Sequence, residues 1–421
     1  MTGLKAWWSR LGRTKRVALG AGLAVIVAAG VLWKRFGDHT LIRLALESPY
    51  RGRCSKVVTR AILDRSLALG TRYLLVHQRP EGNFDYEYDW REKEYSEDDN
   101  EVRQAGAIWG LALLYQDHPT PELGAAVEKG LAFFDDHAVE TPSGARCPGY
   151  RGRKTLGIGT VALIALSYVD YLNTPNAAIP AERRALHERR LSAYLNELRA
   201  SMNPAGLWFG DYDPATCAAR GESSPYSDGE ALLALTKAAR YAGHAELGPL
   251  VVRSADTGHR LNVEQALAEN ADSDTTKAYY QWFTMTLYEL ATSGWPDTAR
   301  YGAWILELAD WQIDVHRTLT RQRNTAYAYE GLIPAYYWAH RQSDAARMAK
   351  YGCVIDLGLE RLISWQVGGP LATSFTGDVD PQDREAVGGV QNEKDEAPLR
   401  VDVTQHQMHA TIYARQLVYT H

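Results

Sequence analysis

Two adjacent carboxylates stand at the start of an apolar helical run, in the most acidic loop of the sequence. Asp98 and Asp99 come directly before Asn100 and the run VRQAGAIWGLALLYQ. Carboxylates at such a position are favoured by free backbone N–H groups and the helix dipole, so helix capping is one interpretation. A pair of carboxylates can also act as general acid and base, which makes both residues catalytic candidates.

The first turn of this predicted helix adds further polar side chains. Arg103 and Gln104 follow Asn100 within four positions. Arg103 could hold a substrate carboxylate through two parallel hydrogen bonds, or it could pair with Asp99. We take Asn100, Arg103 and Gln104 as candidate substrate-binding residues.

Polar positions recur at the start of two later helical runs. Asp228 lies beside Ser227, which has capping-box spacing with Glu230, so capping explains that pair. Glu330 lies in a mostly apolar run, where a carboxylate is costly unless it is paired or used. Tyr327 shares its face of the helix, because the two positions are three residues apart. Asp228 and Glu330 are therefore further catalytic candidates.

The last predicted helix begins with two histidines on one face, His406 and His409. Either could act as a general acid or base, donate to a substrate, or be a hydrogen-bonded core side chain. As metal ligands they would need a third partner, and no HExxH or comparable motif is present. We expect no metal and no cofactor, and we take His406 as catalytic and His409 as substrate-binding.

Other chemistries find little support in the sequence. It contains no GxSxG elbow and no phosphate-binding Walker loop, and its four cysteines are widely scattered without metal-ligand spacing. One or two disulfides are compatible with a compartment outside the cytoplasm, but spacing alone assigns no pairing. The net charge of -5 leaves no basic excess, so we expect no nucleic-acid partner.

An uncharged run from Val17 to Trp33 predicts a membrane segment. A cleaved signal peptide is the competing interpretation, but the run ends in Leu-Trp-Lys-Arg instead of the small residues that cleavage requires. We expect residues 1–16 to be cytoplasmic, 17–33 to form a single transmembrane anchor and 34–55 to be a linker. Residues 56–421 then form a domain on the periplasmic or extracellular side of the cytoplasmic membrane.

The rest of the chain repeats apolar residues at helical spacing and shows no strand-like alternation of any length. The helical runs pair into about six hairpins, each with an outer helix, a polar loop and a more apolar inner helix. We predict an all-α domain in which these hairpins close into a ring, because each can bury its apolar face only against its neighbours. An open solenoid is the alternative.

This pattern resembles the (α/α)6 toroid superfamily, which contains the six-hairpin glycosidases and their epimerase and lyase relatives. The resemblance covers residues from about 55 to 421 and is one of architecture and loop composition. It implies a cleft at one end of the barrel, lined by the loops that lead into the inner helices, where relatives usually handle carbohydrate.

The resemblance makes a glycoside hydrolase acting on a polysaccharide or oligosaccharide the first hypothesis. Hydrolysis requires two carboxylates across the cleft, for which the candidates are Asp98 or Asp99 with Asp228 or Glu330. Aromatic side chains would stack on the sugar rings. The candidates for stacking are Tyr86, Tyr88, Trp90, Trp208 and Tyr327.

Three alternatives remain open. A uronate epimerase or lyase would use His406 or a tyrosine to remove a proton beside a carboxylate held by Arg103. A non-catalytic toroid would bind a glycan or protein partners in an envelope assembly. A terpenoid-cyclase-like enzyme would require an apolar cavity with an acidic motif, but the loops look too polar for it.

Overall fold

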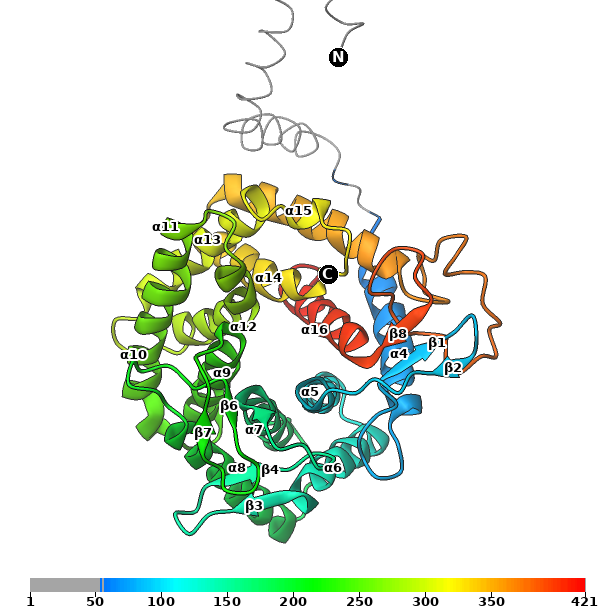
Figure 1. The fold of residues 1–421 in the computed structure, drawn as a ribbon. Helices are drawn as coiled ribbons and strands as arrows, with labels where there is room; N and C mark the ends of the chain where they lie inside the picture. Colours follow the sequence, from blue (N-terminus) through cyan, green and yellow to red (C-terminus); the bar gives the residue numbers. More distant parts are fainter. Residues whose placement is uncertain (1–53, 55–56, 421) are drawn as a thin grey trace, which may run out of the picture. The chain divides into compact units, whose positions relative to one another are not determined.

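Six helical hairpins form a ring in the computed structural model, which describes Cys54 and residues 57–420 (Figure 1). The first helix of each hairpin lies on the outside. The outer helices are α4 (Arg60–His77), α6 (Pro121–Asp136), α8 (Ala181–Ala200), α10 (Gly248–Gly258), α13 (Ala299–Asp314) and α15 (Ala345–Ser364). Helix α10 continues through a π-helical stretch, His259–Gln265, into α11 (Ala266–Glu269).

The second helix of each hairpin lies inside the ring. The inner helices are α5 (Glu101–Asp117), α7 (Ile158–Leu172), α9 (Pro225–Tyr241), α12 (Asp274–Ala291), α14 (Ala326–Arg341) and α16 (Val401–Leu417). Each packs against the next along the chain, and α16 packs back against α5. The structure confirms a mainly helical domain whose hairpins close into a ring.

Burial explains why the inner helices have the more apolar sequences. Every residue of α7 is buried, because the helix is surrounded by α5, α9 and α8. An outer helix such as α13 buries one stripe, with Tyr301, Ile305 and Leu308 facing inward. The difference in sequence between inner and outer helices therefore indicates on which side of the ring a helix lies.

Helix starts are fixed by local caps. The Asn100 side chain accepts a hydrogen bond from the Arg103 N–H at 3.0 Å and so begins α5. Helix α9 starts at Pro225 after Ser224, which places Ser227 inside the first turn, where its hydroxyl donates to the Gly210 carbonyl. The capping-box interpretation of Ser227 and Glu230 is therefore wrong, and Glu230 has another role.

The loops contain short strands that the sequence did not predict. β1 (Glu87–Asp89) pairs antiparallel with β2 (Glu94–Tyr95) and with β8 (Pro398–Arg400), which joins the first hairpin loop to the last. A second sheet is formed by β3 (Ala138–Glu140) and β4 (Arg146–Pro148), and a third by β5 (Leu156–Gly157), β6 (Asp211–Tyr212) and β7 (Ala219–Arg220). The β1–β8 and β5–β6 pairings join loops of different hairpins, whereas β3 and β4 pair within one loop.

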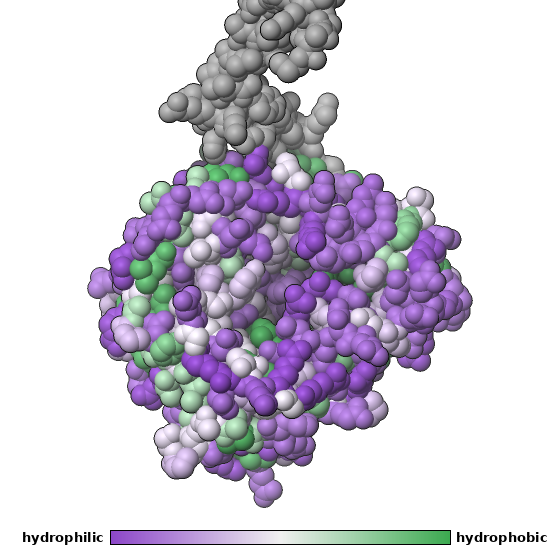
Figure 2. Space-filling view, viewed as in Figure 1, coloured by the Kyte–Doolittle hydropathy of each residue, from purple (hydrophilic) through white to green (hydrophobic). Residues whose placement is uncertain are grey.

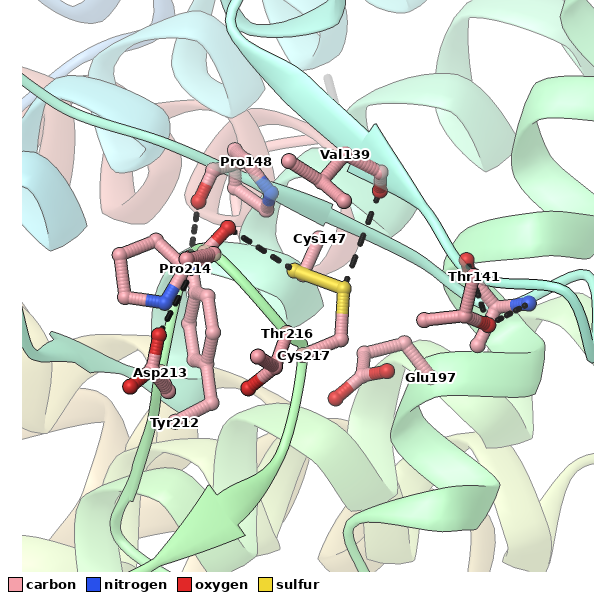
Figure 3. Close-up of a disulfide and its surroundings, with 12 residues drawn as sticks. Val139, Thr141, Cys147, Pro148, Glu197, Tyr212, Asp213, Pro214, Thr216 and Cys217 are labelled. Carbon is pink, nitrogen blue, oxygen red and sulfur yellow. Dashed lines mark hydrogen bonds between the residues drawn. A yellow bond between two sulfur atoms is a disulfide. The ribbon is translucent and has the colours of Figure 1, made fainter.

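A disulfide between Cys147 and Cys217 links two of these loops (Figure 3). Cys147 lies in β4, and Cys217 lies between β6 and β7 with a left-handed backbone, φ 58°. Within residues 57–420, no helix is long and apolar enough to cross a bilayer. The predicted anchor at 17–33 lies outside the residues that the structure describes.

Candidate active site

A cavity of about 1310 Å³ opens at the end of the ring where all six inner helices begin. Figure 2 shows this hollow in the middle of the face, surrounded mainly by hydrophilic residues. Because the inner helices run in the same direction, their first turns and the loops before them supply the lining. The lining includes Asn100, Arg103, Gly159, Tyr226, Glu230, Gln281, Trp282, Tyr327, Arg400, Asp402 and His406.

His406 and Glu330 form a hydrogen-bonded pair between α16 and α14. The Nδ1 atom of His406 lies 3.1 Å from Oε1 of Glu330, and the amide of Gln281 lies 3.2 Å from the same Nδ1. Glu330 is completely buried, whereas a quarter of the His406 side chain is exposed and lines the cavity. This arrangement leaves Nε2 of His406 as the nitrogen available to a bound molecule.

The pair is set deep in the protein, and its charges depend on each other. Burial acts to raise the pKa of Glu330, but His406 and His409 outweigh it and hold the pKa below its usual value. Burial acts to lower the pKa of His406, and the Glu330 carboxylate outweighs it and raises the pKa. Burial lowers the pKa of His409, so that histidine stays neutral. Glu330 is thus ionised and stabilises the protonated form of His406.

His409 completes a three-residue cluster one helical turn along α16. Its Nδ1 lies 3.4 Å from Oε1 of Glu330, and its ring packs edge-on against Trp109. The three side chains offer ligand atoms within 4.8 Å of one another, so they could hold a divalent ion such as Zn²⁺. Glu330 is the third partner that the histidine spacing alone did not supply. Hydrogen bonds from the histidines to the carboxylate account for the same short distances.

A second charged group lies beside this pair. Asp402 accepts from Arg400 at 2.6 Å and lies 3.4 Å from Nε of Arg103, which also donates to the Tyr86 hydroxyl. Burial acts to raise the pKa of Asp402, but Arg400 outweighs it and holds the pKa low. The structure therefore places Arg103 on the cavity wall, fixed by Asp402. Sequence reasoning missed Asp402 and Arg400, which come just before the histidines.

The carboxylates predicted from the first loop do not line the cavity. Asp98 is exposed, and Asp99 is held by Tyr150 at 2.6 Å, Arg151 at 2.8 Å and Gln104 at 2.8 Å. Gln104 is itself fully buried and binds both backbone groups of Phe84. Asp99 and Gln104 therefore stabilise the loop, while Asn100 and Arg103 reach the cavity.

Asp228 also lies away from the cavity. It is buried and accepts hydrogen bonds, each at 3.0 Å, from the Trp208 backbone N–H, the Ser223 hydroxyl and the Asn262 amide. Burial raises the pKa of Asp228 to about 6 despite these donors. With its oxygens occupied, Asp228 joins the third hairpin loop to the π-helical stretch and has a structural role.

Most of the predicted stacking rings are buried within the loops. Trp208 is completely buried with its ring N–H bonded to the Leu198 carbonyl, and Tyr88 and Trp90 are nearly so. Tyr86 is buried; its hydroxyl accepts from Arg103, and the guanidinium of Arg400 lies over its ring. Tyr327 does line the cavity, together with Tyr226 and Trp282, which sequence reasoning did not select.

Glu230, which the sequence analysis assigned to a capping box, is a cavity residue. It is 4% exposed and lines the cavity. Burial alone raises its pKa to about 8, with no charged neighbour contributing. The argument that singled out Glu330, a carboxylate in an apolar inner helix, applies equally to Glu230 and could have found it.

Solved structures share this architecture. A D-mannose isomerase has a TM-score of 0.60 at 13% identity, covering 87% of this chain and 99% of that one. A sugar epimerase from a ruminal bacterium has a TM-score of 0.61 at 10% identity, covering 85% and 98%. A family 76 α-mannanase from Bacteroides thetaiotaomicron has 0.54 at 7%, covering 84% and 94%. No protein-family model and no curated protein matches the sequence.

These likenesses establish the fold. The chain has the (α/α)6 toroid fold of these structures, which confirms the architecture expected from the sequence. Identities of 7 to 13% carry no residue's role from one protein to another. The chemistry must therefore be argued from the cavity of this chain.

Proposed function

We propose that this protein is a sugar isomerase or epimerase in which His406 transfers the proton. The observation that supports it is the His406–Glu330 pair, with one imidazole nitrogen bound to a buried carboxylate and the other available at the cavity. A histidine oriented in this way is suited to exchange a proton with a substrate near neutral pH. The structural likeness to a sugar isomerase and a sugar epimerase agrees with this chemistry.

The reaction starts from the open-chain form of a reducing sugar. Neutral His406 removes the proton from the carbon beside the carbonyl through Nε2, and the electron pair moves to the carbonyl oxygen to give an enediolate. Glu330 stabilises the imidazolium that forms, and Arg103 on the wall can stabilise the enediolate oxygen. Return of the proton to the neighbouring carbon, with transfer of the hydroxyl proton, gives the isomer. Epimerisation also requires the enediolate to turn or another acid to donate, because His406 reaches one face of the carbon.

Hydrolysis of a glycosidic bond is the second candidate. A hydrolase requires a protonated and an ionised carboxyl group facing one cleft. Glu230 and Asp402 both line the cavity, and their pKa values are shifted in opposite directions. We favour isomerisation because Asp402 is held by Arg400 and Arg103, whereas His406 has a free nitrogen.

The test follows the proton. The protein is incubated in D₂O with a panel of reducing sugars that includes D-mannose, and NMR records new isomers and deuterium at the carbon beside the carbonyl. We expect His406→Asn to lower the rates of isomer formation and of deuterium uptake by about 10² to 10⁴-fold, the usual range for loss of a general acid or base.

The matched control is His340→Asn, an exposed histidine at the far end of α14, which should leave both rates unchanged. Full exchange in His406→Asn would rule out the proposed role. New reducing ends from an oligosaccharide, without deuterium uptake, would support the hydrolase. Binding without either reaction would support a glycan-binding toroid.

We also propose that residues 17–33 anchor the toroid on the outer side of a membrane. The uncharged run with its basic flanks supports this location, and so does the Cys147–Cys217 disulfide, since such bonds are rare in the cytosol. Full-length protein made in a bacterium should stay in the membrane pellet after alkaline extraction, with Cys147 and Cys217 protected from alkylation. Leu23→Asp with Val27→Asp should release a soluble protein in which Cys147 and Cys217 are alkylated. Reduced cysteines in the full-length protein would contradict the location.

A further inference from the structure

Glu230 is a buried carboxyl group for which the fold supplies no partner. Its side chain projects from the second turn of α9 into the cavity and is 4% exposed. Across residues 57–420 it has no hydrogen bond and no ion pair. An unpaired carboxyl group in such a place costs stability, and burial makes it a neutral acid at pH 7.

The neighbouring carboxylate on the same helix shows what a structural role requires. Asp228 lies two positions earlier and is equally buried, but a backbone N–H, a hydroxyl and an amide donate to it. It does not line the cavity. The two acids on α9 therefore differ in what they face, since Asp228 faces protein donors and Glu230 faces the space that a ligand would fill.

The neighbouring inner helix, α7, leaves room for the carboxyl group of Glu230. Gly159 lies in the first turn of α7, and a methyl group at that position would come within 2.0 Å of Oε2 of Glu230. A side chain there would displace the acid. The absence of one lets Glu230 lie against the α7 backbone at the edge of the cavity.

From this geometry we propose that Glu230 is a second catalytic residue, which opens the ring of a cyclic sugar by protonating its ring oxygen. The inference rests on the proposed isomerase or epimerase function, because reducing sugars in water are almost entirely cyclic. The proton of Glu230 moves to the ring oxygen as the bond from that oxygen to the anomeric carbon breaks. The anomeric hydroxyl gives its proton to water and becomes the carbonyl. Glu230 recovers a proton from solvent, and His406 then acts on the adjacent carbon.

Two measurements distinguish the role of Glu230 from that of His406. Opening and reclosing the ring interconverts the anomers, which NMR saturation transfer measures, whereas deuterium uptake reports the later step at carbon. With D-mannose and the other sugars of the panel, we expect Glu230→Gln to lose about 10²-fold in both readouts. His406→Asn should lose deuterium uptake and retain anomer interconversion.

Open-chain glyceraldehyde provides a substrate that has no ring to open. Glu230→Gln should exchange its carbon-bound hydrogen as fast as the wild type, whereas His406→Asn should not. Glu182→Gln, an exposed glutamate on α8, is the matched control and should behave as the wild type throughout. Gly159→Ala, which retains the carboxyl group of Glu230 but displaces it, should act like Glu230→Gln on cyclic sugars only.

The outcomes distinguish the ring-opening role of Glu230 from the isomerase or epimerase function on which it rests. Wild-type protein that shows neither readout with any sugar overturns both. Deuterium uptake that depends on His406 but is unaffected in Glu230→Gln overturns the role of Glu230 and leaves the isomerase intact. Equal losses on cyclic sugars and glyceraldehyde in Glu230→Gln also overturn the ring-opening role. The wild-type rate on cyclic sugars should fall at alkaline pH as Glu230 ionises, and this fall should disappear from the residual activity of Glu230→Gln.

Discussion

At the scale of single residues, burial decides the protonation state and the partners decide the role. Glu330 and Glu230 both occupy inner helices and are almost completely buried. Two histidines keep Glu330 ionised, whereas Glu230 has no positive neighbour and remains a neutral acid. The same residue type in the same kind of helix can therefore stabilise a cation in one place and donate a proton in another.

The neutral state of Glu230 predicts how stability depends on pH. Burial raises its folded-state pKa from 4.5 to about 8, so between these values the folded protein binds one more proton than the unfolded chain. The contribution of protonated Glu230 to the free energy of unfolding is complete below the lower pKa. It falls by about 1.4 kcal/mol per pH unit above that pKa and is lost once the pH has risen through the higher one. Chemical denaturation from pH 5 to pH 9 should show that Glu230→Gln gains stability relative to the wild type up to about pH 8 and no more beyond it.

The exposed Glu182→Gln variant should follow the wild-type slope across this range. Parallel curves for Glu230→Gln and wild type would show that Glu230 is ionised in the folded protein. A variant that is more stable at pH 8 yet slower in ring opening would separate a catalytic role from a structural one. Such a trade between stability and activity is common at active sites.

At the scale of elements, helical periodicity was enough to predict the hairpins and the side of the ring on which each helix lies. Inner helices such as α7 are buried on all sides, and this leaves a strong trace in the sequence. The gathering of inner-helix starts at one mouth also followed, and it correctly placed His406, Tyr327 and Arg103 at the cavity. These conclusions depend on the period and direction of helices, which are local properties.

The paths of the loops could not be predicted in the same way. Asp99 attracted attention because its loop is dense in acids, but Tyr150 and Arg151 of the next hairpin loop bind it. Trp208 has the ring expected of a sugar platform, but its N–H is bonded to Leu198 and the ring is part of the core. These partners lie in the next hairpin loop or on the preceding outer helix, and the loop paths that bring them together have no periodic signal.

At the scale of the whole molecule, closure of the ring makes the first and last hairpins neighbours. Helix α16 packs on both α4 and α5, and β8 pairs with β1. Arg415 of α16 lies 2.6 Å from Asp64 of α4 and 2.6 Å from Asp117 of α5. His406, the proposed proton-transfer residue, thus lies on the helix that closes the ring, so closure and the cavity depend on the same contacts.

Removing Arg415 tests whether the ring behaves as one cooperative unit. Arg415→Ala leaves Asp117, which is 11% exposed, without its cation, and we expect a loss of about 2 kcal/mol in the free energy of unfolding. Arg183→Ala removes an ion pair of a more exposed arginine with Glu128 and should cost under about 1 kcal/mol.

An open solenoid would lose its last helix first, because each unit contacts only its neighbours. In a closed ring, amide protection of α16 and α4 in Arg415→Ala should fall together with that of α7 and α9, in a single transition. Early exchange confined to α16, with the remaining inner helices still protected, would show that closure contributes little to the stability of the fold.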